Sequence, residues 1–419
     1  MKKVILSVVA LFLGVIAFAQ NNISDVLQQG NGNTSTVSQA GNNNNSNVDQ
    51  IGDNNDSTVS QSGSTNDSDV YQTGNTNDSS VSQSGTTNLS LVEQNGDGNL
   101  SDVSQNGTSN AFRTTQSGDG NDSYVNQTGT GNSGGMGVGG YVWGTYQTGN
   151  DNYSSTSQDG EYNSASTRQI GDDNWASITQ IGDSNNTNGS FFGIRQEGNA
   201  NHAMTEQYGD YNYNHTRQTG DDNEFRTTQN GNDNWAEVWQ TGDRNTGGGG
   251  VYIWGTNQQG NDNWALVIST GDDNTASTGQ YGNENVAKIE QLGNNNNANG
   301  GNFGIYQTGN NNDAFIGQYG DNNYAHTEQW GNTNDSDIDQ NGDDNDADTN
   351  QNGTDNMSDV NQDGNENHSI VDQNGFEHQS WVNQNGNLNN STVTQTGNNH
   401  WSLVNQNGSG NNSTVTQSN

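Results

Sequence analysis

The chain has 419 residues, of which only 25% are hydrophobic, and it contains neither proline nor cysteine. Its formal net charge of −39 disfavours nucleic acid and anionic membranes as partners, because both would repel it. So little apolar surface excludes a conventional core, and such a composition is ordinarily typical of disorder. Any ordered fold must therefore be stabilised by polar groups, without help from disulfides.

The first nineteen residues differ from the rest and predict a secretory signal peptide. Lys2 and Lys3 precede an apolar run from Val4 to Phe18, and small residues flank Phe18 where signal peptidase would read them. Cleavage is expected before Gln20, which leaves residues 20–419 as one repeat domain outside the cell. No other stretch is apolar enough to span a membrane, so no membrane insertion is expected.

From Gln28 to the C-terminus the chain repeats an eleven-residue unit, Q-x-G-x-x-N-x-(A/S)-x-(V/I/T)-x, thirty-three times. We number its positions 0 to 10, beginning at the glutamine. Glycine holds position 2 in every copy, and position 5 is asparagine except at His378 and His400. Position 0 is glutamine except at Ser269. A disordered chain has no reason to keep this register, so the repeat indicates stacked, ordered units.

The spacing predicts one strand and one tight turn per unit. Positions 5, 7, 9 and the next glutamine share a parity, so they point to one face of a strand, as Asn55, Val59 and Gln61 would. This face is nearly constant and is expected inside, whereas positions 6, 8 and 10 vary and are expected outside. Glycines such as Gly52 and Gly63 reverse the chain. Two units complete one rung, so residue i should stack on residue i+22.

Stacking at about 4.8 Å aligns identical amides, each of which can donate to one neighbour and accept from the other. A buried valine contributes roughly 1.5 to 3 kcal/mol, whereas ordering one residue's backbone costs about 1 to 2 kcal/mol, so amide ladders are needed as well. The predicted architecture is an all-β parallel β-solenoid with two strands per rung and uncapped ends. Its structural ladder positions include Gln28, Gln50, Gln61, Gln72, Gln83, Asn55, Asn77, Gly52, Gly63 and Val59.

Intact copies such as QIGDDNWASITQ (residues 169–180) and QYGDNNYAHTEQ (318–329) resemble the curlin repeat. The resemblance covers nearly the whole chain after the predicted signal peptide. It implies a subunit of curli-type functional amyloid fibres, secreted through a dedicated outer-membrane pore, seeded by a nucleator subunit and built into a biofilm matrix. This chain has many more repeats than a typical curlin subunit, so bulk subunit, nucleator and larger adhesin remain open.

Four units carry Gly- or Asn-rich insertions, which lie within residues 130–146, 183–195, 243–257 and 294–306. Each insertion is expected to end in a strand whose small position 7 holds an aromatic residue: Trp143, Phe192, Trp254 or Phe303. The first and third of these are 111 residues apart, as are the second and fourth, which indicates duplication of a larger block. With two strands per rung, the first two insertions should lie on one edge of the solenoid and the last two on the opposite edge.

The first and last units keep the inward pattern, and the sequence offers no amphipathic helix or proline-rich segment to cover them. A bare rung is an unpaired sheet edge, which invites addition of another chain. We therefore expect head-to-tail self-association; a short terminal arm folded over the edge is the alternative. The expected assembly positions are Asn22, Val26 and Gln28 at one end and Asn411, Val415 and Gln417 at the other.

Acidic turns admit two interpretations. Gly-Asp-Asp-Asn occurs at residues 171–174, 220–223, 271–274 and 342–345, with single aspartates such as Asp53 and Asp210 in similar turns. Stacked carboxylates could bind Ca²⁺, or aspartate is simply a favoured turn residue on a solvated edge. The calcium-binding nonapeptide G-G-x-G-x-D is absent from the sequence, so we favour the second interpretation and expect no cofactor.

Outward positions carry aromatic residues, which could bind glycans or contact neighbouring fibres, although scattered surface aromatics are also ordinary. Histidines at outward positions lack metal-ligand spacing, and no catalytic motif is present, so an enzyme is not expected. Besides a fibre subunit, a monomeric solenoid adhesin and a disordered acidic matrix polymer remain open; mixed side chains at positions 6 and 8 disfavour an ice-binding surface. The outward residues are Trp175, Tyr213, Trp235, Trp264, Tyr324, Trp381 and Trp401, with His202, His215, His326 and His368.

Overall fold

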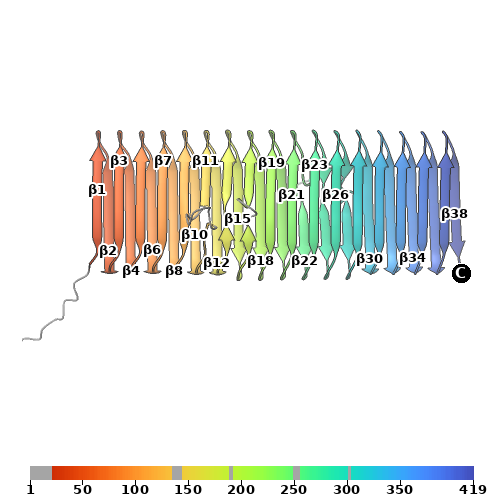
Figure 1. Cartoon of the computed structure of the whole chain (residues 1–419), viewed down its shortest axis with the longest axis horizontal. Helices are drawn as coiled ribbons and strands as arrows, with labels where there is room; N and C mark the ends of the chain where they lie inside the picture. Colours follow the sequence, from red (N-terminus) through yellow and green to blue (C-terminus); the bar gives the residue numbers. More distant parts are fainter. Residues whose placement is uncertain (1–20, 135–143, 188–191, 249–254, 301–302) are drawn as a thin grey trace, which may run out of the picture.

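The structure is a computed structural model that describes residues 21–134, 144–187, 192–248, 255–300 and 303–419. Strands are the only regular elements in these ranges, and no helix there is long and apolar enough to cross a membrane. The strands stack along one axis into a β-solenoid of about 17 turns, with β1 at one end and β38 at the other (Figure 1). The expected signal peptide lies outside the described residues.

Within the described ranges, two sheets of 19 strand segments each form the two sides of the solenoid. Sheet A contains β1 (Ile23–Gln29), β3 (Asn45–Ile51), β5 (Asp67–Thr73), β7 (Leu89–Asn95), β9 (Ala111–Ser117), β11 (Gly144–Thr148), β13 (Ser164–Ala165), β14 (Thr167–Ile170), β16 (Asn186–Thr187), β17 (Ile194–Glu197), β19 (Tyr213–Thr219), β21 (Trp235–Thr241), β23 (Trp264–Thr270), β26 (Val286–Leu292), β29 (Asp313–Tyr319), β31 (Asp335–Asn341), β33 (Met357–Asp363), β35 (Gln379–Asn385) and β37 (Trp401–Asn407).

Sheet B alternates with sheet A along the chain. It contains β2 (Thr34–Asn42), β4 (Asp56–Ser64), β6 (Asp78–Thr86), β8 (Leu100–Thr108), β10 (Asp122–Thr130), β12 (Tyr153–Glu161), β15 (Trp175–Ile181), β18 (His202–Tyr208), β20 (Glu224–Asn230), β22 (Thr256–Gln259), β24 (Thr275–Ala276), β25 (Thr278–Tyr281), β27 (Asn297–Ala298), β28 (Ile305–Thr308), β30 (Tyr324–Asn332), β32 (Asp346–Thr354), β34 (His368–Phe376), β36 (Asn390–Asn398) and β38 (Asn412–Ser418).

The strand pairing is parallel and keeps identical repeat positions opposite one another. In the pairing of β3 with β5, Val48 lies opposite Val70 and Gln50 opposite Gln72, a separation of 22 residues. Where an insertion intervenes, the separation grows but the register is kept, as Gln116 lies opposite Gln147. The predicted parallel solenoid with two strands per rung is therefore confirmed.

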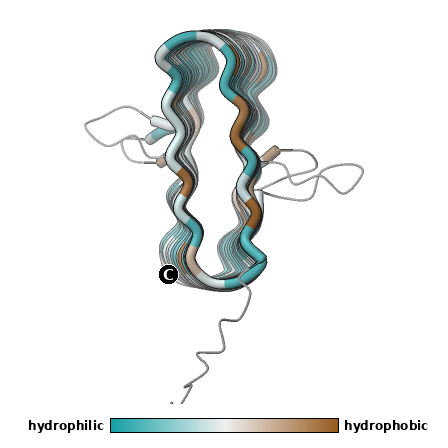
Figure 2. Tube along the Cα trace, turned by 90° about the vertical axis from the view of Figure 1, so that its left-hand side faces the viewer, coloured by the Kyte–Doolittle hydropathy of each residue, from teal (hydrophilic) through white to brown (hydrophobic). Residues whose placement is uncertain are grey.

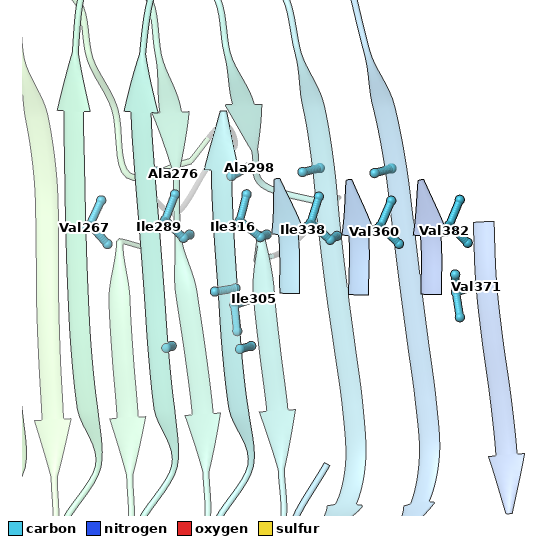
Figure 3. Close-up of a cluster of buried hydrophobic side chains, with 14 of the residues drawn as sticks. Val267, Ala276, Ile289, Ala298, Ile305, Ile316, Ile338, Val360, Val371 and Val382 are labelled. Carbon is cyan, nitrogen blue, oxygen red and sulfur yellow. The ribbon is translucent and has the colours of Figure 1, made fainter. Parts of the chain in front are cut away.

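Seen end-on, the Cα trace has two nearly straight sides joined by tight arcs (Figure 2). Buried side chains from both sheets fill the interior between these sides. Position 9 contributes a file of buried valine and isoleucine residues from each sheet, and position 7 contributes small residues beside it. In the close-up of Figure 3, Ile289, Ile316 and Ile338 of sheet A follow one another along the axis, with Ala276 and Ala298 of sheet B nearby. Small residues at position 7 allow the two sheets to approach closely, which fits a core poor in apolar volume.

Each turn combines two residues with positive φ. Gly52, at position 2, has φ 120°, and a Cβ there would lie 1.9 Å from the carbonyl oxygen of Gly74 in the next rung. Asn54, at position 4, has φ 58° although it is not glycine, a conformation that costs about 1–2 kcal/mol for an L-residue. Its N–H donates to the carbonyl oxygen of Asn31 at 2.8 Å. Contacts between rungs therefore hold the strained position in place.

The four insertions interrupt strands rather than turns. In sheet A they separate Ser133 from Gly144 and Thr187 from Ile194, while in sheet B they separate Thr246 from Thr256 and Ala298 from Ile305. The first two thus begin and end on the opposite side of the solenoid from the last two, as two strands per rung requires. The expectation that they lie at the edges is wrong, because they leave from the flat sides, in mid-strand.

The expectation that Phe192 and Phe303 fill the small position 7 is also wrong. Thr187 lies opposite Ala165, and Ala298 lies opposite Ala276, so residues just before each insertion fill that position. Counting back from the next glutamine missed this, because the insertion divides the strand between positions 7 and 9. The corresponding residues Trp143 and Trp254 lie outside the described residues.

Among the described residues, two aromatic side chains do enter the core at position 7, one rung before an insertion in each case. Phe112 and Phe225 are 1% exposed. A Cβ on Gly144 would lie 2.7 Å from the ring of Phe112, and one on Gly255 would lie 2.3 Å from the ring of Phe225. Glycines at the insertion boundaries therefore make room for these rings.

Candidate functional site

The glutamines at position 0 form a ladder along each sheet. Gln50 Nε2 donates to Gln72 Oε1 at 2.8 Å and to the main-chain carbonyl of Thr34, in sheet B, at 2.9 Å. Both amide hydrogens are thus bonded, one along the axis and one across the interior. Gln28, Gln61 and Gln83 also donate to the next glutamine in the C-terminal direction, at 2.7, 2.8 and 2.9 Å.

The asparagines at position 5 form a second ladder with the opposite donor direction. Asn77 donates from its main-chain N and from Nδ2 to Asn55 Oδ1, at 3.0 and 3.1 Å. The same Nδ2 also donates to the carbonyl oxygen of Gly96 at 2.8 Å. From one asparagine to the next, the bonds therefore donate toward the N-terminal end, whereas from one glutamine to the next they donate toward the C-terminal end. The buried amide of Asn77 is thus satisfied by the rungs on both sides, as buried polar groups require.

A third ladder, which the sequence analysis missed, occupies position 3 of the turns. Asp53 Oδ1 accepts the main-chain N–H of Asn31 at 2.7 Å, and Asp172 Oδ1 accepts that of Asn150 at 2.7 Å. This bond needs an acceptor on a short side chain, which explains the frequent aspartate and asparagine here. The turn interpretation of the Gly-Asp-Asp-Asn segments is thus supported by specific contacts. Among the described residues, no three His, Cys, Asp or Glu side chains form a group that could hold a metal ion.

The glutamine ladder of sheet A has one interruption, at Ser269. Ser269 Oγ donates to Gln291 Oε1 at 2.9 Å. Gln240, one rung before it, donates only to the carbonyl oxygen of Glu224, at 3.5 Å, among the contacts of the described residues. The short serine side chain keeps the bond to Gln291, but it does not reach the amide of Gln240.

The terminal rungs present ladder atoms without partners in the described structure. We define the N-terminal rung as β1 with β2 and the C-terminal rung as β37 with β38. Gln28 donates to Gln50, but its own Oε1 accepts no hydrogen bond from a described residue. Gln417 Oε1 accepts from Gln395, while its Nε2 donates only to the carbonyl oxygen of Trp401 among described residues. One end therefore offers an acceptor and the other a donor.

The remaining predicted end residues behave in the same way. Val26 is 43% exposed at the first rung, although the equivalent Val48 of the next rung is fully buried. Val415 lies partly buried against the hydrophobic core that ends at the last rung. Asn22 Oδ1 accepts the N–H of Asn44 at 3.0 Å, and Asn411 Nδ2 donates to Asn389 Oδ1 at 2.8 Å. Apolar surface and amide groups that are buried inside the solenoid are therefore exposed at its ends.

The two histidines at position 5 lie in the last two rungs of sheet A. Their rings stack with centroids 5.2 Å apart and planes 3° from parallel. The main-chain N–H of His400 donates to His378 Nδ1 at 3.3 Å, in the place of the asparagine Oδ1 used by other rungs. Burial, together with the charge of His400, holds the pKa of His378 below its usual value. The sequence marked both residues as exceptions but did not place them at an end.

Outward aromatic residues stack in files rather than scatter. Trp235 lies between Tyr213 and Trp264, with ring centroids 5.8 and 5.0 Å away and planes within 7° of parallel. In sheet B, Trp175 stacks on Tyr153 and on His202. The parallel register produces these files, because equal positions of neighbouring rungs lie side by side.

A cleft of about 430 Å³ lies on the outer face of sheet B, beside the fourth insertion. Tyr306 lies 5.4 Å from Tyr281 and 5.2 Å from Trp330, measured between ring centroids. His326 and Glu328 add polar groups to the lining. The cleft could not be found from the sequence, because its residues belong to four different units.

Sheet A carries an acidic patch on its outer face near β31. Burial, and then the charges of Asp359, Asp339, Asp335 and Asp313, raise the pKa of Asp337 to about 6. Parallel register places these carboxylates in neighbouring rungs, since β31 pairs with both β29 and β33.

Comparison with known proteins bears on the repeat itself. A family model described as the curlin associated repeat matches residues 20–52, 52–85, 80–107, 149–182, 160–188, 220–246, 271–299, 282–320, 309–342, 342–375 and 392–418. These matches cover more than half of the chain and coincide with rungs of the solenoid. No curated protein matches the chain.

Proposed function

Because the chain belongs to the curlin-repeat family, we propose that it is a secreted structural protein whose copies stack end to end into extracellular amyloid fibres. The observation that carries this proposal is the exposure, at both ends, of rungs built like those inside. Gln28 Oε1 and one amide hydrogen of Gln417 lack partners among the described residues, whereas Gln50 and Gln72 are bonded on both sides. A second copy supplies the missing partners at either end.

Where two copies meet, hydrogen bonds along a whole rung contribute to the free energy of association. Each hydrogen bond contributes a net of roughly 0.5–1.5 kcal/mol, and a rung forms main-chain bonds along two strands in addition to its amide ladders. Val26, 43% exposed in the single chain, would become buried against the preceding copy. The strong negative charge would keep the sides of neighbouring fibres apart, which favours growth along the axis.

The remaining parts of this proposal follow from the family. Curlin-repeat proteins are generally extracellular fibre subunits, which suits a chain that begins with a predicted signal peptide. A secretion pore in the outer membrane and a nucleator subunit are the partners we propose, with biofilm matrix and adhesion as the setting. Stacked repeats that share constant inward residues and vary in their outward residues are typical of structural proteins rather than enzymes.

Electron microscopy and thioflavin fluorescence of the chain from Gln20 onward test the proposal. Unbranched fibres that seed fresh protein are expected. Val415→Lys should abolish elongation, because stacking would bury an unpaired lysine. Thr414→Lys, exposed on the outer face of the same strand, is the matched control and should leave elongation intact. A chain that stays folded and monomeric for days, even with seeds, would contradict fibre formation.

A second function, adhesion by the solenoid surface, is favoured by the cleft around Tyr306. The four aromatic rings of Tyr281, Phe303, Tyr306 and Trp330, with a carboxylate and an imidazole, suit a pyranose. The C–H faces of a pyranose stack on rings while its hydroxyls bond polar groups. Glycan-array binding that is lost in Trp330→Ala would support this role. Trp239→Ala is the control, because Trp239 is similarly exposed, at 41% against 42%, but lies outside the cleft. Equal binding by both variants would rule the cleft out.

A further inference from the structure

Two copies can continue the ladders in only one polarity. If two identical ends met, a two-fold axis would relate the copies and their facing strands would run antiparallel. Glutamine would then face glutamine at no more than isolated points, and valine files would be broken. If the N-terminal rung of one copy meets the C-terminal rung of another, the strands stay parallel and every repeat position meets its equivalent.

The hydrogen-bonding groups at the two ends agree with this polarity. At the C-terminal rung, Gln406 and Gln417 donate across the interior at 2.8 and 2.9 Å, and each retains one amide hydrogen that points along the ladder. At the N-terminal rung, Gln28 and Gln39 donate toward the interior of the stack, which leaves their Oε1 atoms as acceptors. Glutamine donors thus meet acceptors when unlike ends join, whereas two C-terminal rungs would bring donors against donors and two N-terminal rungs would bring acceptors against acceptors.

At the C-terminal rung, the position of the asparagine ladder that faces an incoming copy is held by His400. In the stack, the main-chain N–H at position 5 donates to the side chain one rung toward the N-terminus, as Asn77 does to Asn55. An incoming copy would place Asn22 over His400, so its N–H would donate to His400 Nδ1. His400 makes this bond itself, to His378 Nδ1 at 3.3 Å. A protonated Nδ1 carries a hydrogen and cannot accept the bond.

The surroundings of the two rings disfavour a positive charge. The Nε2 atoms of His378 and His400 contact the main-chain carbonyls of Asn374 and Thr396, at 3.3 and 3.0 Å. Glu377, the adjacent acidic residue, is exposed at the turn, and no carboxylate of the described residues pairs with either ring. On the incoming strand the nearest charge in sequence, Asp25, has outward parity. Two imidazolium rings 5.2 Å apart would therefore repel without a counter-ion.

We propose that the C-terminal rung is the receiving surface for the N-terminal rung of a second copy, and that this joint requires an unprotonated Nδ1 on His400, stacked on His378. The inference rests on the proposed end-to-end assembly and specifies its polarity and its chemistry. All copies in a fibre then point the same way. Mild acid stops the addition of new copies while leaving the interior of each solenoid folded.

A pair of end-blocked chains tests a single joint without fibres. Val26→Lys blocks the N-terminal rung and leaves the receiving surface free; Val415→Lys does the reverse. Each variant alone should stay monomeric at pH 7.5 by sedimentation or mass photometry, and an equimolar mixture should form dimers. Dimers of either variant alone would overturn the polarity. At pH 5.0 the mixture should lose dimer affinity by at least about tenfold, with unchanged circular dichroism.

Histidine variants separate the second half of the proposal from the first. His378→Asn with His400→Asn, introduced into the V26K chain, restores the asparagine ladder and should give dimers at both pH values. His368→Asn, an outward histidine paired with Asp346 at 3.1 Å, is the control and should keep the acid sensitivity. Equal dimer affinity of the original pair at pH 7.5 and 5.0 would overturn the role of histidine alone. If the unmodified chain forms fibres but the mixture of V26K and V415K chains forms no dimer, the proposed joint is wrong. If neither fibres nor dimers form, the proposed function is wrong.

Discussion

The glycines at position 2 approach the next rung so closely that Gly52 has no room for a side chain: a Cβ would lie 1.9 Å from the carbonyl oxygen of Gly74. Gly52→Ala should therefore lower the free energy of unfolding by at least about 3 kcal/mol, because positive φ and a main-chain clash combine. Guanidinium unfolding of the chain blocked at both ends by V26K and V415K measures this. Asn54→Gly is the control and should change stability by no more than about 1 kcal/mol, since its φ suits glycine.

Filling the interruption in the glutamine ladder should stabilise the solenoid. Ser269→Gln would accept the unused hydrogen of Gln240 and donate to Gln291, which completes the ladder of sheet A. We expect an increase of about 1 kcal/mol in the free energy of unfolding, the net value of a hydrogen bond or two. Hydrogen exchange of the neighbouring β21 and β26 amides should slow. Unchanged or faster exchange there would show that the gap is better filled by serine.

Several serine hydroxyls at position 7 are buried without a hydrogen-bond partner among the described residues, including those of Ser68 and Ser90. Alanine takes the same position in the middle of the chain, for example at Ala176. Ser68→Ala should therefore raise the free energy of unfolding by about 1 kcal/mol, since an unsatisfied buried hydroxyl is unfavourable. Ser60→Ala, on the exposed face of β4, should change it by less than about 0.5 kcal/mol. Thermal melting of the end-blocked chain compares the two; a loss of stability in Ser68→Ala would reveal a bonded hydroxyl.

The acidic patch predicts that acid increases the stability of the folded chain, whereas acid is expected to decrease the affinity between two copies. The raised pKa of Asp337, about 6, means that the folded chain holds this proton to higher pH than the unfolded chain does. Its contribution to stability is therefore largest below about pH 4, the unfolded value, and is lost as the pH rises through 6. Asp337→Asn should raise the melting temperature at pH 7 and flatten its dependence between pH 4 and 6.

Solvent screens Asp337, which is more than a third exposed, so the shift in melting temperature should be small. Asp372→Asn, on the exposed face of β34 and outside the patch, should leave the dependence between pH 4 and 6 intact. A profile unaltered by Asp337→Asn would contradict the assignment. Acid that stabilises the single chain but prevents dimerisation would separate folding from assembly.

The repeat in the sequence predicted the architecture because its period is set by local geometry. Parity along a strand placed Val59 and Gln61 inside, and glycine at position 2 placed the turns. What escaped prediction depends on contacts between rungs. The left-handed Asn54 and the acceptor role of Asp53 arise from main-chain groups 22 residues or more away, which no single unit reveals.

The course of the insertions and the role of the end residues could not be predicted from the sequence for a related reason. Spacing alone could not show that Thr187 completes its strand before the chain departs, because only pairing with Ala165 fixes its position. Likewise, His378 and His400 read as two substitutions among many asparagines. Their proposed role in assembly follows from their place in the last two rungs of sheet A, because a second copy would meet the last rung.

The opposed donor directions of the two amide ladders bear on how long such a stack can grow. Each ladder glutamine turns its amide oxygen toward the N-terminal rung, and each ladder asparagine turns its amide oxygen toward the C-terminal rung, as Gln72 and Asn55 do. In an α-helix aligned peptide dipoles add, so charge accumulates at both ends. Here the side-chain dipoles of one rung largely cancel, so the axial field should not build up as rungs are added. The side-chain amide dipoles would then add no growing field at the tip of an assembly of many copies.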